Sequence, residues 1–557
     1  MDSESLIVIP ARGGSKGVPR KNLKLLAGRP LIHHCLTSAC SVDGVTVVVS
    51  TEDEEIMAVA GEICKNVIER PAALSGDDIA LDEVVVHAVE AAEEIFGLRF
   101  GKILTIQPTS PFITAGSILE AVGALDEADS VISVTDDRHL RWKESDGRPV
   151  PMFAERVNRQ WMEPCWVESG GIIACRRELI DAGSRIGENV YLLKLDATEG
   201  HDIDTPMDWS VAESIAMTPS FAFRVLGNSE LGLGHAYRAL TIADRLPSKP
   251  IFIVDSGSGP AADLIKSRHY EVVVCDNVED LLVCLDARGV DIVVNDVLDT
   301  TKDEIGAIVS DERLVVNFED LGEGSKLADL TINALYEQEV PEPNQRYGWP
   351  WVCLRDEFVG VTERDVEGSH VLITFGGTDP RNLSSEALSA LSGMTEGGLG
   401  SKIGDLHVKL VLGPGNPRLG EVSKLGEELA GSFASIEVMQ SVSRISGLMR
   451  AADFAITSNG RTVFELAACN TPTITISQNE REDLHTFSSV CRGTINLGWS
   501  ESFPDDSFAE AIEKMLGEDG DANRERMRSE LGLYDLSLGT DRVINEIESH
   551  FRNKRRR

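Results

Sequence analysis

Three times along this chain, a short apolar run leads directly into a loop that contains glycines. The runs cover residues 6–9, 221–226 and 370–375, and helical patterns follow each of them. Alternation of short buried strands with amphipathic helices predicts an α/β fold with largely parallel sheets. At 557 residues the chain is too long for one ordinary core. Because each run restarts the alternation, we predict several α/β units in succession.

The boundaries of these units follow from the restarts. We expect a first domain over residues 1–217, a short linker over 216–220, and two similar α/β halves over 221–350 and 351–545. The remaining stretch, 546–557, is expected to be a basic tail, and its end, 552–557, is predicted to be disordered. Two similar halves of this kind commonly hold a ligand in the cleft between them. The second part of the chain is therefore expected to bind a ligand of its own.

The charge of the chain excludes some partners. The formal net charge is −38, and such a surface repels nucleic acid and anionic membranes. It is typical either of an ordinary solvated exterior or of adaptation to high salt, where repulsion is screened. The sequence shows no apolar run of membrane-spanning length and no signal-peptide pattern, and its ten cysteines are scattered. We expect a cytoplasmic protein with no nucleic-acid or membrane partner.

The loop after the first apolar run carries the groups that a triphosphate needs. Gly13 allows close approach of the backbone, whose N–H groups can hold phosphate oxygens. Arg12 and Lys16 add positive charge, and Ser15 adds a hydroxyl. The glycine and lysine spacing fits neither a Walker A loop nor G-x-G-x-x-G. The loop predicts a nucleoside-triphosphate site at the carboxyl end of the first strand.

A pair of aspartates provides a second piece of the same chemistry. Asp202 and Asp204 are two residues apart, so on an extended segment they point to the same side. Mg²⁺ prefers one or two carboxylates completed by phosphate and water oxygens. Alone, such a pair also suits a solvated turn. Combined with the glycine loop, it predicts a Mg²⁺ site that uses Asp202 and Asp204 as ligands.

These motifs together resemble those of the CMP-sialic acid synthetases, the acylneuraminate cytidylyltransferases. The matching stretches are 9–23, Arg70-Pro71, 107–111 and 202–205. The resemblance implies a nucleotidyltransferase domain of Rossmann-like fold that uses CTP to activate a nonulosonic acid of the sialic, legionaminic or pseudaminic type. It implies Asn22 and Arg70 near the nucleotide, Gln107 and the pair Arg159-Gln160 near the sugar, and a homo-oligomer.

The second part of the chain carries its own candidate site. His235 follows a glycine loop at a predicted helix start, where the helix dipole favours the neutral, basic imidazole; a packing histidine is the alternative. Gly376, Gly377 and Thr378 form a candidate phosphate turn after a strand. Glu465 could accept hydrogen bonds from a ribose, or merely favour the helix dipole.

This second part resembles the GT-B-fold nucleotide-sugar enzymes, most closely the pseudaminic-pathway UDP-sugar hydrolases. The resemblance rests on the Gly-x-Gly-His loop, the 376–379 turn and residues 355–358, and implies that His235 activates water against a UDP-linked amino sugar. The chain departs from the pattern at Leu226 and Phe464, and no tyrosine follows Asp296 closely. A glycosyltransferase and a non-catalytic nucleotide-sugar-binding module remain alternatives, because fold alone does not fix a reaction.

Overall fold

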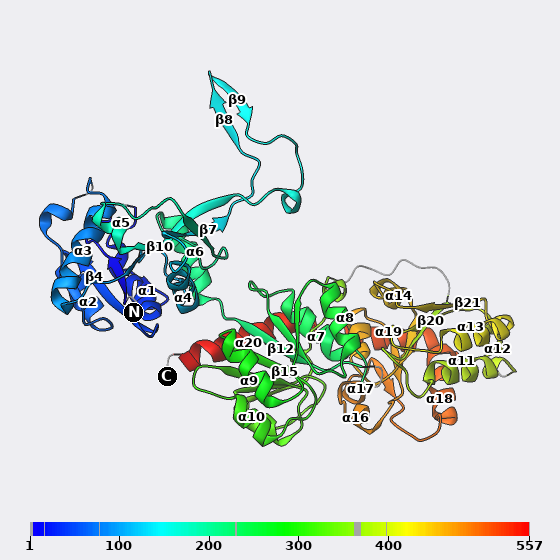
Figure 1. Cartoon of the computed structure of the whole chain (residues 1–557). Helices are drawn as coiled ribbons and strands as arrows, with labels where there is room; N and C mark the ends of the chain where they lie inside the picture. The colour runs from blue at the N-terminus through cyan, green and yellow to red at the C-terminus, as the bar shows by residue number, and fades with distance from the viewer. Residues whose placement is uncertain are drawn as a thin grey trace. The chain divides into compact units, whose positions relative to one another are not determined.

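A computed structural model describes residues 4–15, 17–76, 78–228, 231–360, 369–396 and 398–555. The chain divides into two compact units, 1–218 and 219–557 (Figure 1). Both are built on sheets of mainly parallel strands, which confirms the expected α/β class. Lys16, a predicted triphosphate ligand, lies outside the described residues.

The first unit contains one seven-stranded sheet. Its strands, in spatial order, are β11 (Val190–Lys194), β7 (Ser130–Asp136), β10 (Trp166–Arg176), β6 (Lys102–Ile106), β1 (Ser5–Pro10), β4 (Val45–Thr51) and β5 (Val67–Glu69). Strand β10 runs antiparallel to both of its neighbours, and the other pairs are parallel. The carboxyl ends of β1, β4 and β6 therefore meet at one edge, where open α/β sheets bind their ligands.

Alternating side chains of the central strands give this sheet two apolar faces. Ile7 and Ile9 of β1 belong to one buried cluster with α1 (Leu31–Cys40), α2 (Glu54–Gly61) and α4 (Ala115–Ala124). Leu6 and Val8 belong to another with α3 (Leu81–Phe96). Successive strand residues point to opposite faces, so helices cover both sides. A strand buried on both faces reads as a continuous apolar run, as this one does.

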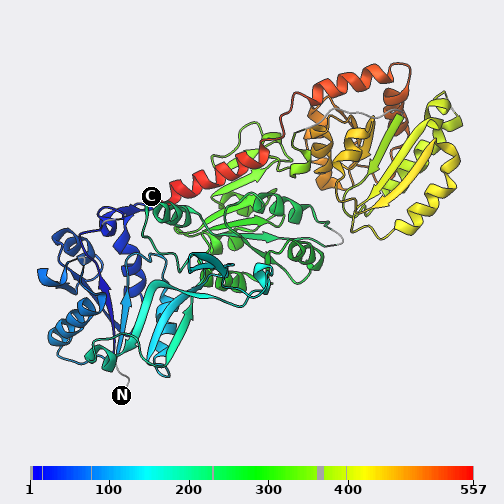
Figure 2. The ribbon, with the colours of Figure 1, turned by 90° about the horizontal axis from the view of Figure 1, so that it is seen from above.

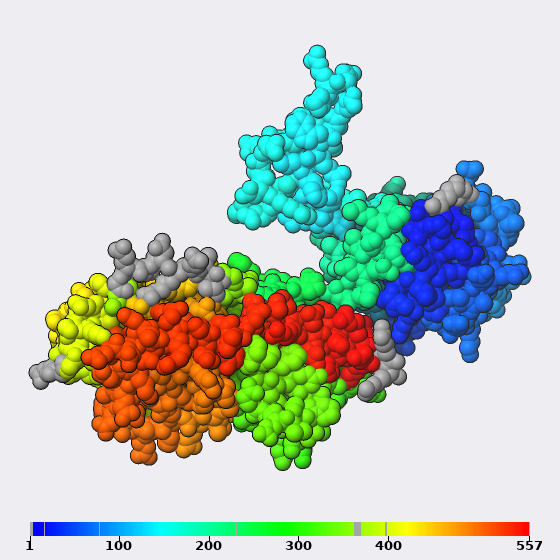
Figure 3. Space-filling model, turned by 180° about the vertical axis from the view of Figure 1, so that it is seen from behind, coloured from blue at the N-terminus to red at the C-terminus, as the bar shows by residue number. Residues whose placement is uncertain are grey.

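A slender arm extends from the first unit between β7 and β10 (Figures 1 and 3). It carries the hairpin β8 (Trp142–Ser145) and β9 (Arg148–Pro151), a separate two-stranded sheet, followed by the short helix η3 (Arg159–Trp161). Large apolar side chains on the arm are exposed, including Trp142 (54%), Met152 (61%) and Trp161 (74%).

The second unit contains two parallel sheets. The first is ordered β14 (Glu271–Val274), β13 (Ile251–Val254), β12 (Phe221–Val225), β15 (Ile292–Asp296), β16 (Leu314–Phe318), β17 (Leu330–Asn333), β18 (Gln345–Tyr347). The second is ordered β21 (Ser435–Gln440), β20 (Leu406–Leu412), β19 (Ser369–Thr374), β22 (Phe454–Thr457), β23 (Thr473–Thr475), β24 (Thr494–Asn496). In each, the chain starts centrally, winds outward and then reverses, which is the doubly wound order of Rossmann-type sheets. Two such halves in one unit form a GT-B-like pair.

The expectation of a disordered basic tail is wrong. Residues 539–555 form helix α20 (Gly539–Arg555), which lies along the first half of the second unit (Figure 2). Val543, Ile547 and Phe551 of this helix are buried in the same apolar cluster as strands β12 and β16. The basic residues are also paired, Lys554 with Asp329 (2.7 Å) and Arg555 with Asp291 (2.5 Å). Burial of the apolar side chains, which are spaced along one face of the helix, stabilises it in spite of the run of basic residues. Of the basic residues at this end, Arg556 and Arg557 lie outside the described residues.

Removal of the Phe551 side chain tests the role of α20. Phe551→Ala should lower the free energy of unfolding of the second unit by about 3–5 kcal/mol, the usual cost of emptying a buried phenylalanine site. Urea unfolding of the full chain would measure it. The neighbouring Arg552 side chain is 56% exposed, so Arg552→Ala is the matched control, and it should change the free energy of unfolding only slightly. Equal unfolding midpoints for both variants would favour the tail interpretation.

Two further findings concern the chain as a whole. All ten cysteines lie within the described residues, and none of them forms a disulfide. Across the described ranges, no helix combines the length and the apolar character needed to cross a membrane.

Candidate functional site

The first unit has a cavity of about 530 Å³ at the carboxyl edge of its sheet. Its walls come from the loop after β1, the segment after β5, the end of β6 and the segment before α6 (Pro206–Met217). The structure brings these predicted residues together around it: Arg12, Ser15, Asn22, Arg70, Gln107, Asp202 and Asp204. Segments that are up to about two hundred residues apart in the sequence thus share one pocket.

Tight backbone contacts explain the glycines in the first loop. A Cβ atom on Gly13 would lie 2.3 Å from the Asp53 carboxylate, and its N–H donates to Glu52 Oε1 (2.8 Å). A Cβ atom on Gly17 would lie 2.2 Å from the carbonyl oxygen of Asp204. The loop therefore packs against the Asp53 side chain at Gly13 and against the backbone of Asp204 at Gly17, and a side chain at Gly17 would collide with that backbone.

Several of the cavity residues also hold its walls in place. Arg70 is buried and donates to the carbonyl oxygen of Ser50 (2.6 Å), and its guanidinium lies 3.5 Å from Glu52. Asn22 donates to the carbonyl oxygen of Arg12 (2.9 Å), and Gln107 donates to that of Gly170 (2.9 Å). These bonds orient the side chains by fixing one end of each amide or guanidinium.

The two aspartates have different surroundings. Burial raises the pKa of Asp202, and the nearby charge of Asp204 raises it further, while a hydrogen bond from Thr109 opposes this. Asp204 is exposed, and Lys21 lies 3.3 Å from its Oδ1 atom. Lys21 Nζ also donates to the carbonyl oxygen of Ile203. Lys21 is a site residue that motif reasoning missed, although its place beside Asn22 in the matching stretch is a usable signal.

The structure does not bring Arg159 and Gln160 to this cavity. Both lie in η3 on the projecting arm, where their side chains are exposed, and neither lines the pocket. Within the described residues there is also no group of three or more side chains of metal-binding type. The candidate metal ligands are thus the two aspartates alone.

The second unit has a cavity of about 320 Å³ lined from both of its halves. The predicted nucleotide-binding residues Gly376, Gly377 and Thr378, after β19, line it, and so does Glu465 of α15 (Thr462–Ala468). The loop before α7 (Gly234–Ala243) contributes residues 231–234 from the other half. Glu465 Oε1 accepts a hydrogen bond from Arg355 (3.2 Å), a partner that was not predicted.

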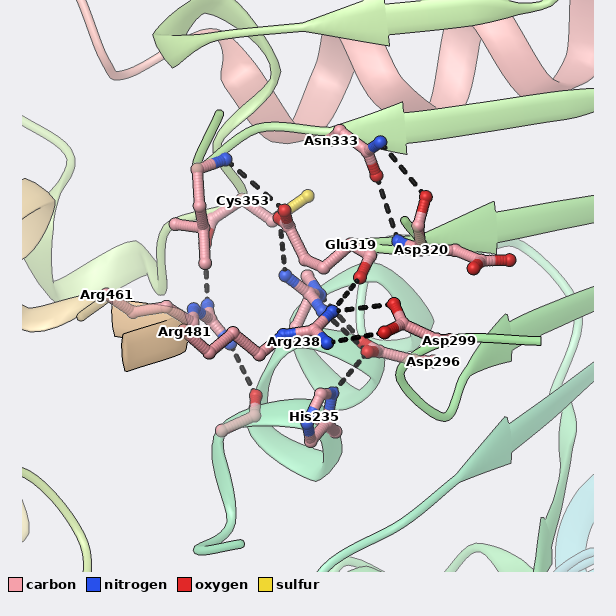
Figure 4. A network of polar contacts seen from close by, with 12 residues as sticks. His235, Arg238, Asp296, Asp299, Glu319, Asp320, Asn333, Cys353, Arg461 and Arg481 are labelled. Carbon is pink, nitrogen blue, oxygen red and sulfur yellow. Dashed lines mark hydrogen bonds and ion pairs between the residues drawn. The ribbon is translucent and has the colours of Figure 1, made fainter. Parts of the chain in front are cut away.

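His235 belongs to a buried polar network beside this cavity (Figure 4). Its Nδ1 atom lies 2.5 Å from Oδ1 of Asp296, at the end of β15. Arg238, one turn further along α7, donates to both oxygens of Asp296 (2.6 and 2.5 Å) and to Glu319 (2.9 Å). The imidazole itself is not among the cavity-lining groups, although the adjacent Gly234 is.

The charges of this network are matched inside the protein. Burial alone would raise the pKa of Asp296, but the positive charge of Arg238 and the hydrogen bonds it receives hold that pKa well below its ordinary value. Asp296 therefore stays ionised and orients the His235 ring through Nδ1, which leaves Nε2 for chemistry. Asp296 and Arg238 were not predicted as site residues. For Asp296 a signal was available, because the polar pair Asn295-Asp296 ends the otherwise apolar strand β15.

Comparisons with known proteins agree with the first unit's architecture. The cytidylyltransferase family model matches residues 6–148. CMP-N,N'-diacetyllegionaminic acid synthase of Legionella pneumophila is 33% identical over 232 residues, which cover 38% of this chain and 95% of that protein. N-acylneuraminate cytidylyltransferase A of Danio rerio is 34% identical over 216 residues, covering 37% of this chain and 49% of that protein.

Other similarities are more distant. An uncharacterized protein of Methanocaldococcus jannaschii is 28% identical over 273 residues, covering 46% of this chain and 54% of that protein. The chain thus spans about half the length of two of these three relatives. The crystal structure of MurG from Acinetobacter baumannii covers 59% of this chain and all of MurG, with 12% identity and a TM-score of 0.47.

Proposed function

The chain belongs to the cytidylyltransferase family that contains the CMP-sialic acid and CMP-legionaminic acid synthases, and from this premise we propose that its first unit activates a nonulosonic acid with CTP. The observation that carries the proposal is the cavity shared by Arg12, Arg70, Gln107, Asp202 and Asp204. Cationic, amide and carboxylate groups in one pocket suit a triphosphate, a polar sugar and a metal ion together.

The proposed reaction is a nucleotidyl transfer. The anomeric hydroxyl of the sugar attacks the α-phosphorus of CTP and gives up its proton to water. A new C–O–P linkage forms, and the bond to the β-phosphate oxygen breaks to release pyrophosphate. Arg12 and Ser15, together with Lys16, would hold the triphosphate and offset the charge of the leaving group. Such catalysis is mainly positioning and electrostatic stabilisation. Gln107 would face the sugar.

Mg²⁺ fits the residues at the aspartate pair. Asp202 and Asp204 line one cavity, and burial together with the charge of Asp204 raises the pKa of Asp202, an effect that a bound divalent cation would oppose. One or two protein carboxylates suffice when phosphates and water complete the octahedron. When bound there, the ion would supply charge neutralisation between the phosphates and a lower pKa for a nearby hydroxyl. Lys21 would keep Asp204 oriented.

A direct assay tests this proposal. The protein is incubated with CTP, Mg²⁺ and, in turn, sialic, legionaminic and pseudaminic acid, and pyrophosphate release is measured. We expect one of the three to give sugar-dependent release and a CMP-sugar product. Absence of release with all three, in a folded protein, would contradict the proposal.

For the second unit we propose hydrolysis of a UDP-linked amino sugar. The observation that favours it is the His235–Asp296 pair, a base held by a buried carboxylate beside a cavity with a phosphate turn. His235 Nε2 would take a proton from water, whose oxygen attacks the anomeric carbon while the bond to the phosphate oxygen breaks. The products are the free sugar and UDP.

Two alternative functions of the second unit predict different requirements for the release of UDP. A glycosyltransferase on the same GT-B-like scaffold would release UDP only when an acceptor sugar is present. A binding module would hold the UDP-sugar without releasing UDP. Measuring UDP release with and without added acceptors therefore separates hydrolysis, transfer and binding.

We also propose that the arm mediates homo-oligomer formation. Trp142, Met152 and Trp161 expose large apolar side chains on the arm, and exposed apolar surface of this size is typical of interaction sites. The double variant Trp142→Ser/Trp161→Ser should shift the protein from oligomer to monomer in analytical ultracentrifugation. Met207 on α6 is 78% exposed but lies off the arm, so Met207→Ser should leave the mass unchanged. A wild-type monomer would contradict this proposal.

A further inference from the structure

One wall of the cavity in the second unit has no role in the proposed hydrolysis. It is formed by the segment after β23, which contributes Gln478, Asn479 and Glu482. Glu482 lies in the short helix α16 (Glu480–Asp483). This wall lies in the same cavity as the phosphate turn at 376–378, so any diphosphate bound at that turn shares the cavity with it.

On this wall, the side chains of Gln478 and Glu482 leave hydrogen-bonding capacity for a ligand. Gln478 is buried and donates through Nε2 to the carbonyl oxygen of Phe375 (2.9 Å), and its Oε1 atom has no partner in the described structure. Glu482 Oε2 accepts the backbone N–H of Gln478 (2.9 Å). Its Oε1 atom lies toward Gly460, where a Cβ would still be 3.6 Å away. An unsatisfied buried acceptor is costly, so a ligand donor here is favourable.

The surroundings of Glu482 make its charge sensitive to a ligand. Burial raises the pKa of Glu482 to about 7, and the charge of Asp379 adds to this effect. The Asp379 carboxylate accepts the backbone N–H groups of Leu383 and Ser384 (2.8 and 3.0 Å). Other ionisable groups of the neighbouring segments have hydrogen-bond or ion-pair partners other than Glu482: Arg461, Glu465, Arg481, Asp483 and His485.

We propose that Glu482 is a ligand-binding residue that acts as a neutral acid, taking up a proton from solution when a nucleotide diphosphate enters the cavity. The Glu482 O–H would then donate to the ligand, while Gln478 Oε1 accepts from a ligand hydroxyl or amide N–H. The physical reason is that a diphosphate and an ionised carboxylate in one cavity repel each other. This inference rests on the proposed nucleotide-sugar site and extends it.

Calorimetric titration of the full chain with UDP tests the inference. At pH 8, titrations in buffers of different ionisation enthalpy should report uptake of about one proton per bound UDP, and Glu482→Gln should abolish this uptake. Glu480→Gln is the matched control, since Glu480 is exposed on the same short helix, and it should keep the uptake. For the wild type, the Kd for UDP should weaken about tenfold per pH unit above pH 7.5.

The outcomes separate the two proposals. UDP binding without proton uptake, or uptake that persists in Glu482→Gln, overturns this inference and leaves the nucleotide site intact. Absence of UDP binding by the folded wild type overturns the nucleotide site and this inference with it. Should Glu482→Gln fail to fold, the pH dependence of the wild-type Kd still decides, because a pH-independent Kd contradicts proton uptake.

Discussion

Asp204→Asn is expected to reduce Mg²⁺-dependent pyrophosphate release from CTP at least about a hundredfold while leaving the protein folded. The substitution keeps the size of the side chain but removes the charge that would hold the ion. Asp204 is largely exposed, and its ion pair with Lys21 is at the surface, so little stability depends on it. Pyrophosphate release at saturating CTP and sugar, over a series of Mg²⁺ concentrations, measures the effect.

The control for this variant is another exposed carboxylate of the same unit. Asp43 lies on the turn before β4 and does not line the cavity, so Asp43→Asn should retain wild-type turnover. Near-wild-type turnover in Asp204→Asn, at every Mg²⁺ concentration, would remove the metal assignment. A parallel loss of the thermal transition in Asp204→Asn alone would instead indicate a structural role.

His235→Ala should reduce UDP release by the second unit at least about a hundredfold, because the variant loses the group that accepts a proton from water. CTP-dependent pyrophosphate release should be unchanged, because the CTP cavity is formed entirely by residues of the first unit. Both activities are measured on the same preparation. Loss of both would indicate a general folding defect and not a catalytic role.

Substitution of His235 tests the catalytic role more directly than substitution of its partner Asp296. Asp296→Asn would leave Arg238 buried with an incomplete set of charges, and breaking a buried pair typically costs about 3–5 kcal/mol of stability. Lost activity in that variant could therefore come from lost folding. The control for His235→Ala is His269→Asn, at an exposed turn with a φ of 62°, a conformation that asparagine tolerates. Undiminished UDP release in His235→Ala would contradict the proposed role of His235 as a general base.

Local signals along the chain predicted the central strands and several residues of the first cavity, but they missed Lys21 there and wrongly placed Arg159 and Gln160 beside it. Continuous apolar runs such as 6–9 predict strands buried on both faces, and β1 has that environment. The aspartate pair and the first loop were predicted to act together, and both line one cavity. The prediction failed for the basic end of the chain, because a charge run says nothing about the apolar side chains one helical turn apart that bury α20.

What the sequence determined by itself was the class of fold and several of the residues that line the first cavity, since both are encoded in short stretches whose residue types and spacing act locally. What only the tertiary structure decided was which distant groups meet. The pairing of His235 with Asp296, the place of Arg159 on the arm, and the wall with Glu482 all depend on how separate strands and loops are brought together. Burial and nearby charge, which set the ionisation of Asp296 and Glu482, exist only after that assembly.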